Sequence, residues 1–253
     1  MKNVRIDWKI QVAYYQKFLF TVISVFLSIV LFILTFVFET LNHFNNFELY
    51  SNLYTIFKSL TSLVFVVMMF YSIYKLNFKR KIQHYFFMVF VLFCFAGDVS
   101  INFNFLAGMI AFFAAHIFYI ISCFFISKFP IKKILFSLLI YFVVFLIINL
   151  MFGLSIFNQD PLYWVTVNFY ALVLTTSLVL SIFIYMDKQS LYALFQLIAM
   201  VLFLVSDSLL MFNHFLVDVY KSDDLTVSLN FFVLLTYYIS MNISSINLKK
   251  ITY

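Results

Sequence analysis

The sequence predicts an all-α polytopic membrane protein that forms a bundle of about eight transmembrane helices. Hydrophobic residues make up 65% of the chain, charged residues make up only 10%, and the mean hydropathy is +1.06. The apolar residues gather in runs about as long as the ~20 residues that a membrane-spanning helix needs. These runs cover residues 18–38, 52–74, 82–103, 105–127, 132–152, 162–186, 190–213 and 227–247. We therefore predict a single transmembrane helical domain over residues 18–250.

Residues 1–17 form a basic segment before the first apolar run. The segment contains Trp8, Tyr14 and Tyr15, which are residue types that favour the membrane–water interface. We expect it to lie in that interface. The first run lacks the small residues of a signal-peptide cleavage site, so we expect it to stay as a spanning helix.

Charge placement predicts the orientation. If the N-terminus is cytoplasmic, nearly all of the 16 lysine and arginine residues fall on the cytoplasmic side, with Lys58 and Lys221 as exceptions. The opposite side then carries acidic residues: Glu39, Glu48, Asp160, Asp218, Asp223 and Asp224. We expect both termini in the cytoplasm and the protein in a bacterial inner membrane. The net charge of +6 then describes a collar facing membrane lipid and indicates no nucleic-acid partner.

Three charged residues lie inside the apolar runs: Lys58, Asp98 and Asp207. A charge at membrane depth costs at least ~2.5–3.5 kcal/mol, so such residues usually have a partner and a function. The alternative interpretation is an ion pair that only holds the bundle together. Two carboxylates are a costly way to do that, which favours a functional site.

Counting residues from the predicted helix ends places these charges at a common depth. Each lies roughly 7–10 Å below the non-cytoplasmic end of its helix. Further polar residues follow at similar or slightly greater depth, and the site we predict contains Lys58, Asp98, Asn102, His116, Tyr119, Tyr170, Ser206, Asp207, Tyr237 and Tyr238. Lys58 also belongs to a polar stripe with Thr61 and Ser62 at helical spacing.

The charge count suggests how the two acids divide their roles. One lysine cannot neutralise two buried carboxylates, and both burial and like charge disfavour the second ionisation. We therefore expect one acid to stay ionised beside Lys58 while the other holds a proton. Glycosidases use this arrangement, in which an acid protonates the leaving group and a carboxylate stabilises an oxocarbenium-like state.

The chain resembles the lysoplasmalogenase family, the YhhN-like eight-helix membrane proteins. The likeness lies in GDVSINFNFLAGMIAFFAAHIFYI, residues 97–120, and in AMVLFLVSDSLLMF, residues 199–212. The paired Tyr237-Tyr238 and the lysine at position 58 extend it to further helices. These motifs together span most of the chain.

The resemblance implies hydrolysis of the vinyl ether bond of lysoplasmalogens to a fatty aldehyde and a glycerophospho-ethanolamine or -choline. Protonation of the outer vinyl carbon gives an oxocarbenium ion, so a protonated aspartate and a carboxylate suit the chemistry. Asp98 and Asp207 would take these roles, in an order left open, and His116 would relay protons or position water. Lys58 would tune the acids, which Tyr119, Ser206 and Tyr237 would orient. No metal or organic cofactor is implied.

Other classes remain open at this point. Intramembrane Asp, Lys and His also build proton relays, so a proton-coupled transporter is the main alternative, although inverted repeats and interrupted helices are not evident. A non-catalytic lysolipid-binding membrane protein is another. An intramembrane aspartyl protease would need a glycine where Phe95 stands, and the four histidines are too scattered for a zinc site. The sequence carries no signal for an oligomeric state.

Overall fold

The predicted all-helical bundle is confirmed by a computed structural model, which describes residues 8–45, 47–74, 81–127, 131–159, 161–220 and 223–247. Within these residues the structure has eight helices and no strand. The helices are α1 (Trp8–Asn45), α2 (Glu48–Tyr74), α3 (Ile82–Ser100), α4 (Phe105–Ile126), α5 (Ile131–Gln159), α6 (Pro161–Lys188), α7 (Leu191–Tyr220) and α8 (Asp223–Asn247). All eight of these described helices are long and apolar enough to cross a membrane, so the chain is an integral membrane protein.

The helix bounds differ from the apolar runs in an informative way. The first helix extends well beyond the predicted 18–38 at both ends, and α7 continues to Tyr220 rather than stopping at 213. Hydropathy marks only the part of a helix in hydrocarbon, whereas backbone hydrogen bonding continues into the polar interface. In contrast, α3 ends at Ser100, before the predicted 103, because the chain turns there and Asn104 caps α4 by accepting the Ala107 amide at 3.0 Å.

Six of the helices form a closed ring, as their pairwise packing shows. Going around it, α2 packs on α3, α3 on α4, α4 on α6, α6 on α7, α7 on α8, and α8 on α2. The ring encloses a core rich in aromatic side chains, among them Phe65, Phe90, Phe203 and Tyr237. Most side chains that point into the ring are therefore surrounded by other helices.

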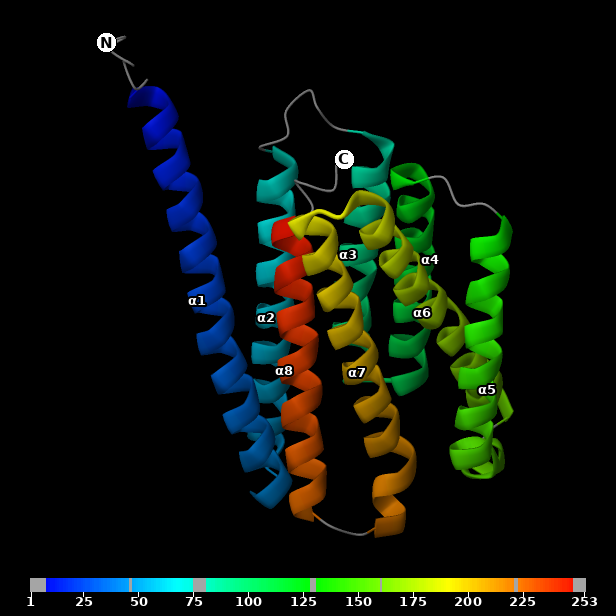
Figure 1. Cartoon of the computed structure of the whole chain (residues 1–253). Coiled ribbons are helices and arrows are strands. Elements are labelled where there is room, and N and C mark those ends of the chain that lie inside the picture. Colours follow the sequence, from blue (N-terminus) through cyan, green and yellow to red (C-terminus); the bar gives the residue numbers. More distant parts are fainter. Residues whose placement is uncertain are drawn as a thin grey trace.

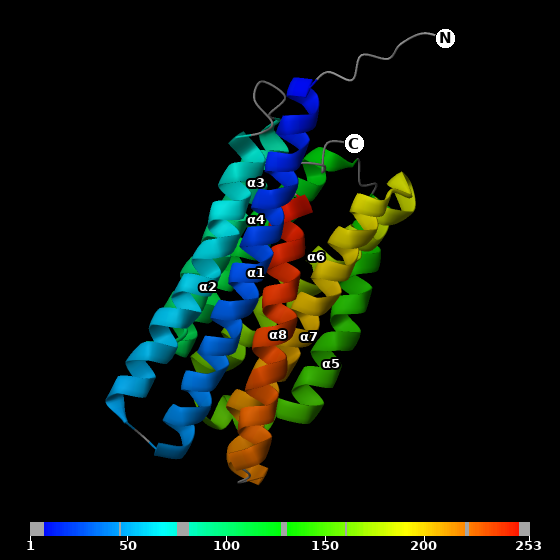
Figure 2. The same ribbon diagram turned by 90° about the vertical axis from the view of Figure 1, so that its left-hand side faces the viewer.

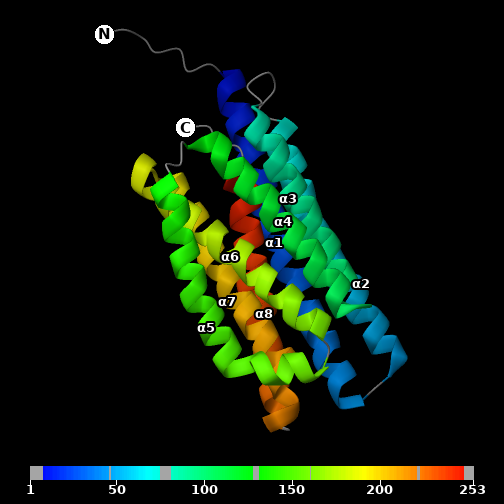
Figure 3. The ribbon, with the colours of Figure 1, turned by 90° about the vertical axis from the view of Figure 1, so that its right-hand side faces the viewer.

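The two remaining helices lie outside the ring. Helix α1 packs on α2 and α8 at one edge of the bundle (Figure 2), and α5 packs on α6, with a smaller contact to α7, at the opposite edge (Figure 3). Most of the α5 surface between residues 133 and 150 is not buried by other helices. Both outer helices thus present long apolar surfaces to lipid.

Helix α1 begins, and α8 ends, at the same end of the bundle (Figure 1), as expected for an even number of spans. At that end an ion pair of 2.9 Å between Lys133 and Asp187 joins α5 to α6. Part of the predicted interfacial segment 1–17 lies outside the described residues, and from Trp8 onward its backbone is helical. The interfacial position of this segment and the cytoplasmic location of both termini stay predictions.

The α3–α4 hairpin depends on two glycines at its closest approach. A Cβ atom placed on Gly108 would lie 2.6 Å from the Ile101 Cβ and 2.9 Å from the Ile101 Cα. A Cβ atom on Gly97 would lie 3.0 Å from the Phe112 ring. Small residues of this kind allow membrane helices to approach closely. At Gly108 the obstacle includes backbone, which cannot move aside as a flexible side chain can.

We expect Gly108→Ala to destabilise the protein by about 1–3 kcal/mol, because the added methyl group must displace the Ile101 backbone. Thermal unfolding of the purified protein in detergent measures the change. The neighbouring Ala107 is exposed, so Ala107→Ser should change stability by no more than about 0.5 kcal/mol. A Gly108→Ala protein as stable as wild type would show that the hairpin tolerates a wider spacing.

Candidate active site

Each helix of the ring contributes one or more of the residues that the sequence singled out. These residues are Lys58 on α2, Asp98 on α3, His116 and Tyr119 on α4, Tyr170 on α6, Ser206 and Asp207 on α7, and Tyr237 and Tyr238 on α8. All of them are buried. Four of these helices, α2, α3, α7 and α8, bring such residues to one cavity, whereas those on α4 and α6 do not line it.

Lys58 and Asp98 form a buried ion pair. The Lys58 Nζ lies 3.5 Å from the Asp98 Oδ1 and donates a hydrogen bond of 2.9 Å to the Asn102 Oδ1. The Ser62 hydroxyl donates to the other Asp98 oxygen, and the Asn102 amide donates back to the Asp98 carbonyl. The carboxylate of Asp98 is thus held by one cation and one hydroxyl, in an arrangement that joins α2 to the end of α3.

Asp207 has a different environment. Its carboxyl group accepts a hydrogen bond from the Tyr170 hydroxyl across the α6–α7 contact. Asp207 is buried, and among the described residues it forms no ion pair. The two acids therefore differ in the feature that matters for proton chemistry, because one has a cation beside it and the other has a neutral hydroxyl.

Both acids line one small cavity, which we call the acid cavity. Its volume is about 30 Å³. The lining residues are Lys58, Asp98, Ile101, Phe112, Ser206, Asp207, Leu210, Val233, Leu234 and Tyr237. A cavity of ~10–15 Å³ on this measure holds one water molecule, so this one has room for water next to both carboxyl groups.

The hydroxyl groups of Ser206 and Tyr237 line the acid cavity but bond to backbone. The Ser206 hydroxyl donates to the Val233 carbonyl at 3.0 Å, and the Tyr237 hydroxyl donates to the Cys94 carbonyl at 3.2 Å. These bonds satisfy carbonyls of α8 and α3 inside the ring. Both hydroxyls border the space between the acids, and in this structure neither is hydrogen-bonded to a carboxylate.

Five of the ten predicted site residues do not line the acid cavity: Asn102, His116, Tyr119, Tyr170 and Tyr238. Tyr119 does not orient either acid: its hydroxyl is 2.7 Å from the Ser181 Oγ and borders a separate small cavity. Tyr238 packs its ring against Phe65 and Phe32 instead. Their helical positions were read correctly, but a spacing of three or four residues places side chains on one face without giving the partner that each one reaches.

His116 occupies an intermediate position. Its ring meets the Tyr170 ring edge-on, with centroids 5.8 Å apart, and packs on Phe203 at 4.8 Å. Its Nδ1 lies 3.1 Å from the Ser177 Oγ, and its Nε2 has no hydrogen-bond partner within the described part of the chain. His116 therefore supports the tyrosine that binds Asp207 and does not border the acid cavity.

Glu39 belongs to this region, contrary to the expectation that it faces the non-cytoplasmic solution. It lies within α1, its Oε2 is buried, and its carboxyl group interacts electrostatically with Lys58. Asn230 on α8 is hydrogen-bonded to Glu39 and also accepts from the Asn213 amide on α7. Lys58 thus interacts with carboxyl groups on both helices that flank α2.

Glu39 was missed because it stands near the end of its apolar run, where an acid usually marks the interface. The Lys58 ammonium also lies 5.5 Å from the centre of the Tyr54 ring, a cation–π distance that the sequence pattern did not indicate. A signal in the sequence was Lys58 itself, because a charge inside a membrane usually pairs with other polar groups.

Asp207 also borders a larger hollow on the outside of the ring. This lipid-facing groove has a volume of about 440 Å³ and lies between α5, α6 and α7. Tyr170 and Asp207 line it together with mostly aliphatic side chains.

Groups of three or more His, Cys, Asp or Glu side chains placed to hold a metal do not occur among the described residues.

Comparison with known proteins gives one match. The model of the YhhN family matches residues 53–242, well over half of the chain. This range begins in α2 and ends in α8, so it covers most of the six-helix ring together with α5 and leaves α1 out. No curated protein and no solved structure matches the chain.

Replacing only one residue of the ion pair between Lys58 and Asp98 should destabilise the protein. We expect Lys58→Met to lower the unfolding free energy by about 3–5 kcal/mol, because it leaves the buried Asp98 carboxylate without its cation. The Lys58→Met, Asp98→Asn double variant should recover most of that loss, since the remaining amide needs no counter-charge. Thermal or denaturant unfolding in detergent measures Lys58→Met, Asp98→Asn and the double variant, and losses of the two single variants that simply add in the double variant would contradict the coupling.

Proposed function

The chain belongs to the YhhN family, and we propose that it is a membrane-embedded hydrolase that cleaves the vinyl ether bond of lysoplasmalogens. The products are a fatty aldehyde and a glycerophospho-ethanolamine or -choline. The substrate is a lysophospholipid drawn from the membrane, and we place the protein in a bacterial cytoplasmic membrane. The proposal combines the family likeness with the chemistry of the two aspartates.

One observation carries the proposal. Two carboxyl groups in unlike electrostatic settings line a single cavity that has room for water. Asp98 has Lys58 at 3.5 Å, whereas Asp207 has only the Tyr170 hydroxyl among the described residues. Because burial disfavours a charge that has no partner, Asp98 is suited to act as the carboxylate and Asp207 as the acid that carries a proton.

The reaction then runs in two stages. Asp207 donates its proton to the outer carbon of the vinyl ether, and the double-bond electrons form the new C–H bond. The resulting oxocarbenium ion is stabilised by the carboxylates of Asp98 and Asp207. Water adds to the cationic carbon, and its proton returns to Asp207. The hemiacetal collapses to the aldehyde and the free glycerol hydroxyl, so the net change is the addition of one water.

The neighbouring residues assist without touching the reacting atoms. Tyr170 positions Asp207 through its hydroxyl, and His116 holds the Tyr170 ring in place. Lys58 keeps the Asp98 carboxylate ionised, and Asn102 holds Lys58 in place by accepting a hydrogen bond from its Nζ. In this proposal Tyr119 and Tyr238 serve packing within the ring.

The decisive assay measures aldehyde release from lysoplasmenylethanolamine by the purified protein. We expect Asp207→Asn to lower the rate by about 10²–10⁴-fold, because the amide cannot supply the proton. Asp98→Asn should also abolish most activity, since the cation loses its stabilising charge. Asp187→Asn is the matched control, because Asp187 is an acid at the far end of the bundle, where it pairs with Lys133 and accepts a hydrogen bond from Ser127.

Two outcomes would contradict the proposal. Full aldehyde release by a folded Asp207→Asn protein would remove Asp207 from the chemistry. No release by wild type, combined with proton movement in proteoliposomes, would favour a proton-coupled transporter built on the same buried charges. Tight lysolipid binding without any product would instead indicate a non-catalytic lipid-binding protein.

A further inference from the structure

The lipid-facing groove owes its existence to the loose attachment of α5. Helix α5 packs along α6 but makes only a small contact with α7, so the two helices do not close over the ring surface between them. The hollow that remains has a volume of about 440 Å³, within the usual range of ~300–1,000 Å³ for ligand pockets. Figure 3 shows α5 standing in front of α6 and α7 on this side of the bundle.

The lining of the groove is aliphatic. Helix α5 contributes Val144, Ile147 and Ile148, and α6 and α7 contribute further leucine and alanine side chains. Ile147 and Ser208 are exposed at the outer surface, and the Ser208 hydroxyl donates to the Leu204 carbonyl of its own helix. The polar members of the lining are Tyr170, Thr175, Asp207 and Ser208, and the rest of the surface suits a hydrocarbon chain.

The groove reaches the chemistry at Asp207. This residue lines both the groove and the acid cavity, so it separates an apolar space from a polar one. On the polar side lie Lys58 and Asp98, with Asn102 beyond them. A vinyl ether likewise has a polar side and an apolar side. Its oxygen leads to the glycerol and headgroup, whereas its outer carbon begins the hydrocarbon chain.

We propose that the groove between α5, α6 and α7 binds the hydrocarbon chain of a lysolipid that reaches Asp207 sideways from the bilayer. This inference rests on the proposed function and deepens it by giving the route and the binding site of the chain. The vinyl carbon that accepts the proton then lies at the inner end of the groove, beside Asp207.

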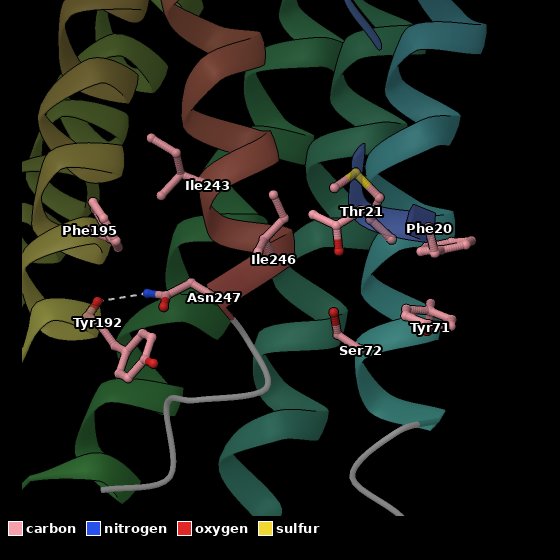
Figure 4. Close-up of a pocket in the computed structure, with 10 residues that line it drawn as sticks. Phe20, Thr21, Tyr71, Ser72, Tyr192, Phe195, Ile243, Ile246 and Asn247 are labelled. Atoms are coloured by element: carbon pink, nitrogen blue, oxygen red, sulfur yellow. Dashed lines mark hydrogen bonds between the residues drawn. The ribbon is translucent and has the colours of Figure 1, made fainter. Parts of the chain in front are cut away.

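A second large hollow is a less suitable place for the chain. It has a volume of about 320 Å³ and lies between α1, α2, α7 and α8 (Figure 4). There the Asn247 amide bonds to the Tyr192 carbonyl at 2.7 Å, near the end of α8 and the start of α7. This is the end of the bundle at which α1 begins, and neither acid lines this hollow.

The test uses a photoreactive probe, an alkyl-ether lysophosphatidylethanolamine with a diazirine on its chain, which the enzyme cannot hydrolyse. After illumination in proteoliposomes, mass spectrometry locates the labelled residues. We expect labelling within 144–148, 170–175 and 204–212. Ser208→Phe and Ile147→Trp fill the groove from opposite helices at exposed positions, and each should reduce this labelling by at least about tenfold. Val205→Phe, also exposed on α7 but outside the groove, should leave it unchanged.

The outcomes separate this inference from the proposed function. Labelling concentrated in the hollow of Figure 4, or labelling that both groove variants leave unchanged, would overturn the groove even if aldehyde release persists. Labelling in the groove that the variants remove would support it, including in a protein that releases no aldehyde. In the active protein, the groove variants should also raise the KM for long-chain substrates more than for short-chain ones.

Discussion

The ion pair between Lys58 and Asp98 is the constraint on which the rest of the site depends. A buried lysine is tolerable in a membrane only where acceptors surround it, and here they come from α3, from the turn that follows it and from α1. Because Lys58 is occupied in this way, Asp207 on α7 is left without a cation among the described residues. The contrast between the two acids is therefore a product of which helices flank α2.

The bundle could be predicted from the sequence because the bilayer permits so few structures. Runs of about 20 apolar residues in a membrane form helices, since every backbone group must be satisfied within its own segment. The order of packing was not predictable in the same way. The placement of α1 and α5 outside a ring of six depends on side-chain fit, such as the close approach at Gly108, which hydropathy does not measure.

The site was predictable to the extent that charge in hydrocarbon is expensive. That reasoning found Lys58, Asp98 and Asp207, but the depth estimate behind it was inaccurate: Asp98 lies beside the end of α3 at Ser100, whereas α7 runs far beyond Asp207. Asp98 and Asp207 still line one cavity, because α3 ends at Ser100 and is much shorter than α7. The same reasoning missed Glu39, which interacts with Lys58 although its position in the sequence indicated the membrane interface. It also included Tyr119, whose side chain borders a separate cavity.

The position of the ion pair in consecutive helices has a consequence for how the chain enters the membrane during synthesis. Lys58 and Asp98 stand on α2 and α3, which form neighbouring spans, so the two charges are inserted together as a nearly neutral hairpin. Each alone would oppose insertion by about 2.5–3.5 kcal/mol. Asp207 arrives much later, on the seventh span, when its tyrosine partner on α6 is already in place. Because of the order of the helices along the chain, Lys58, Asp98 and Asp207 each have a partner available when they enter the membrane.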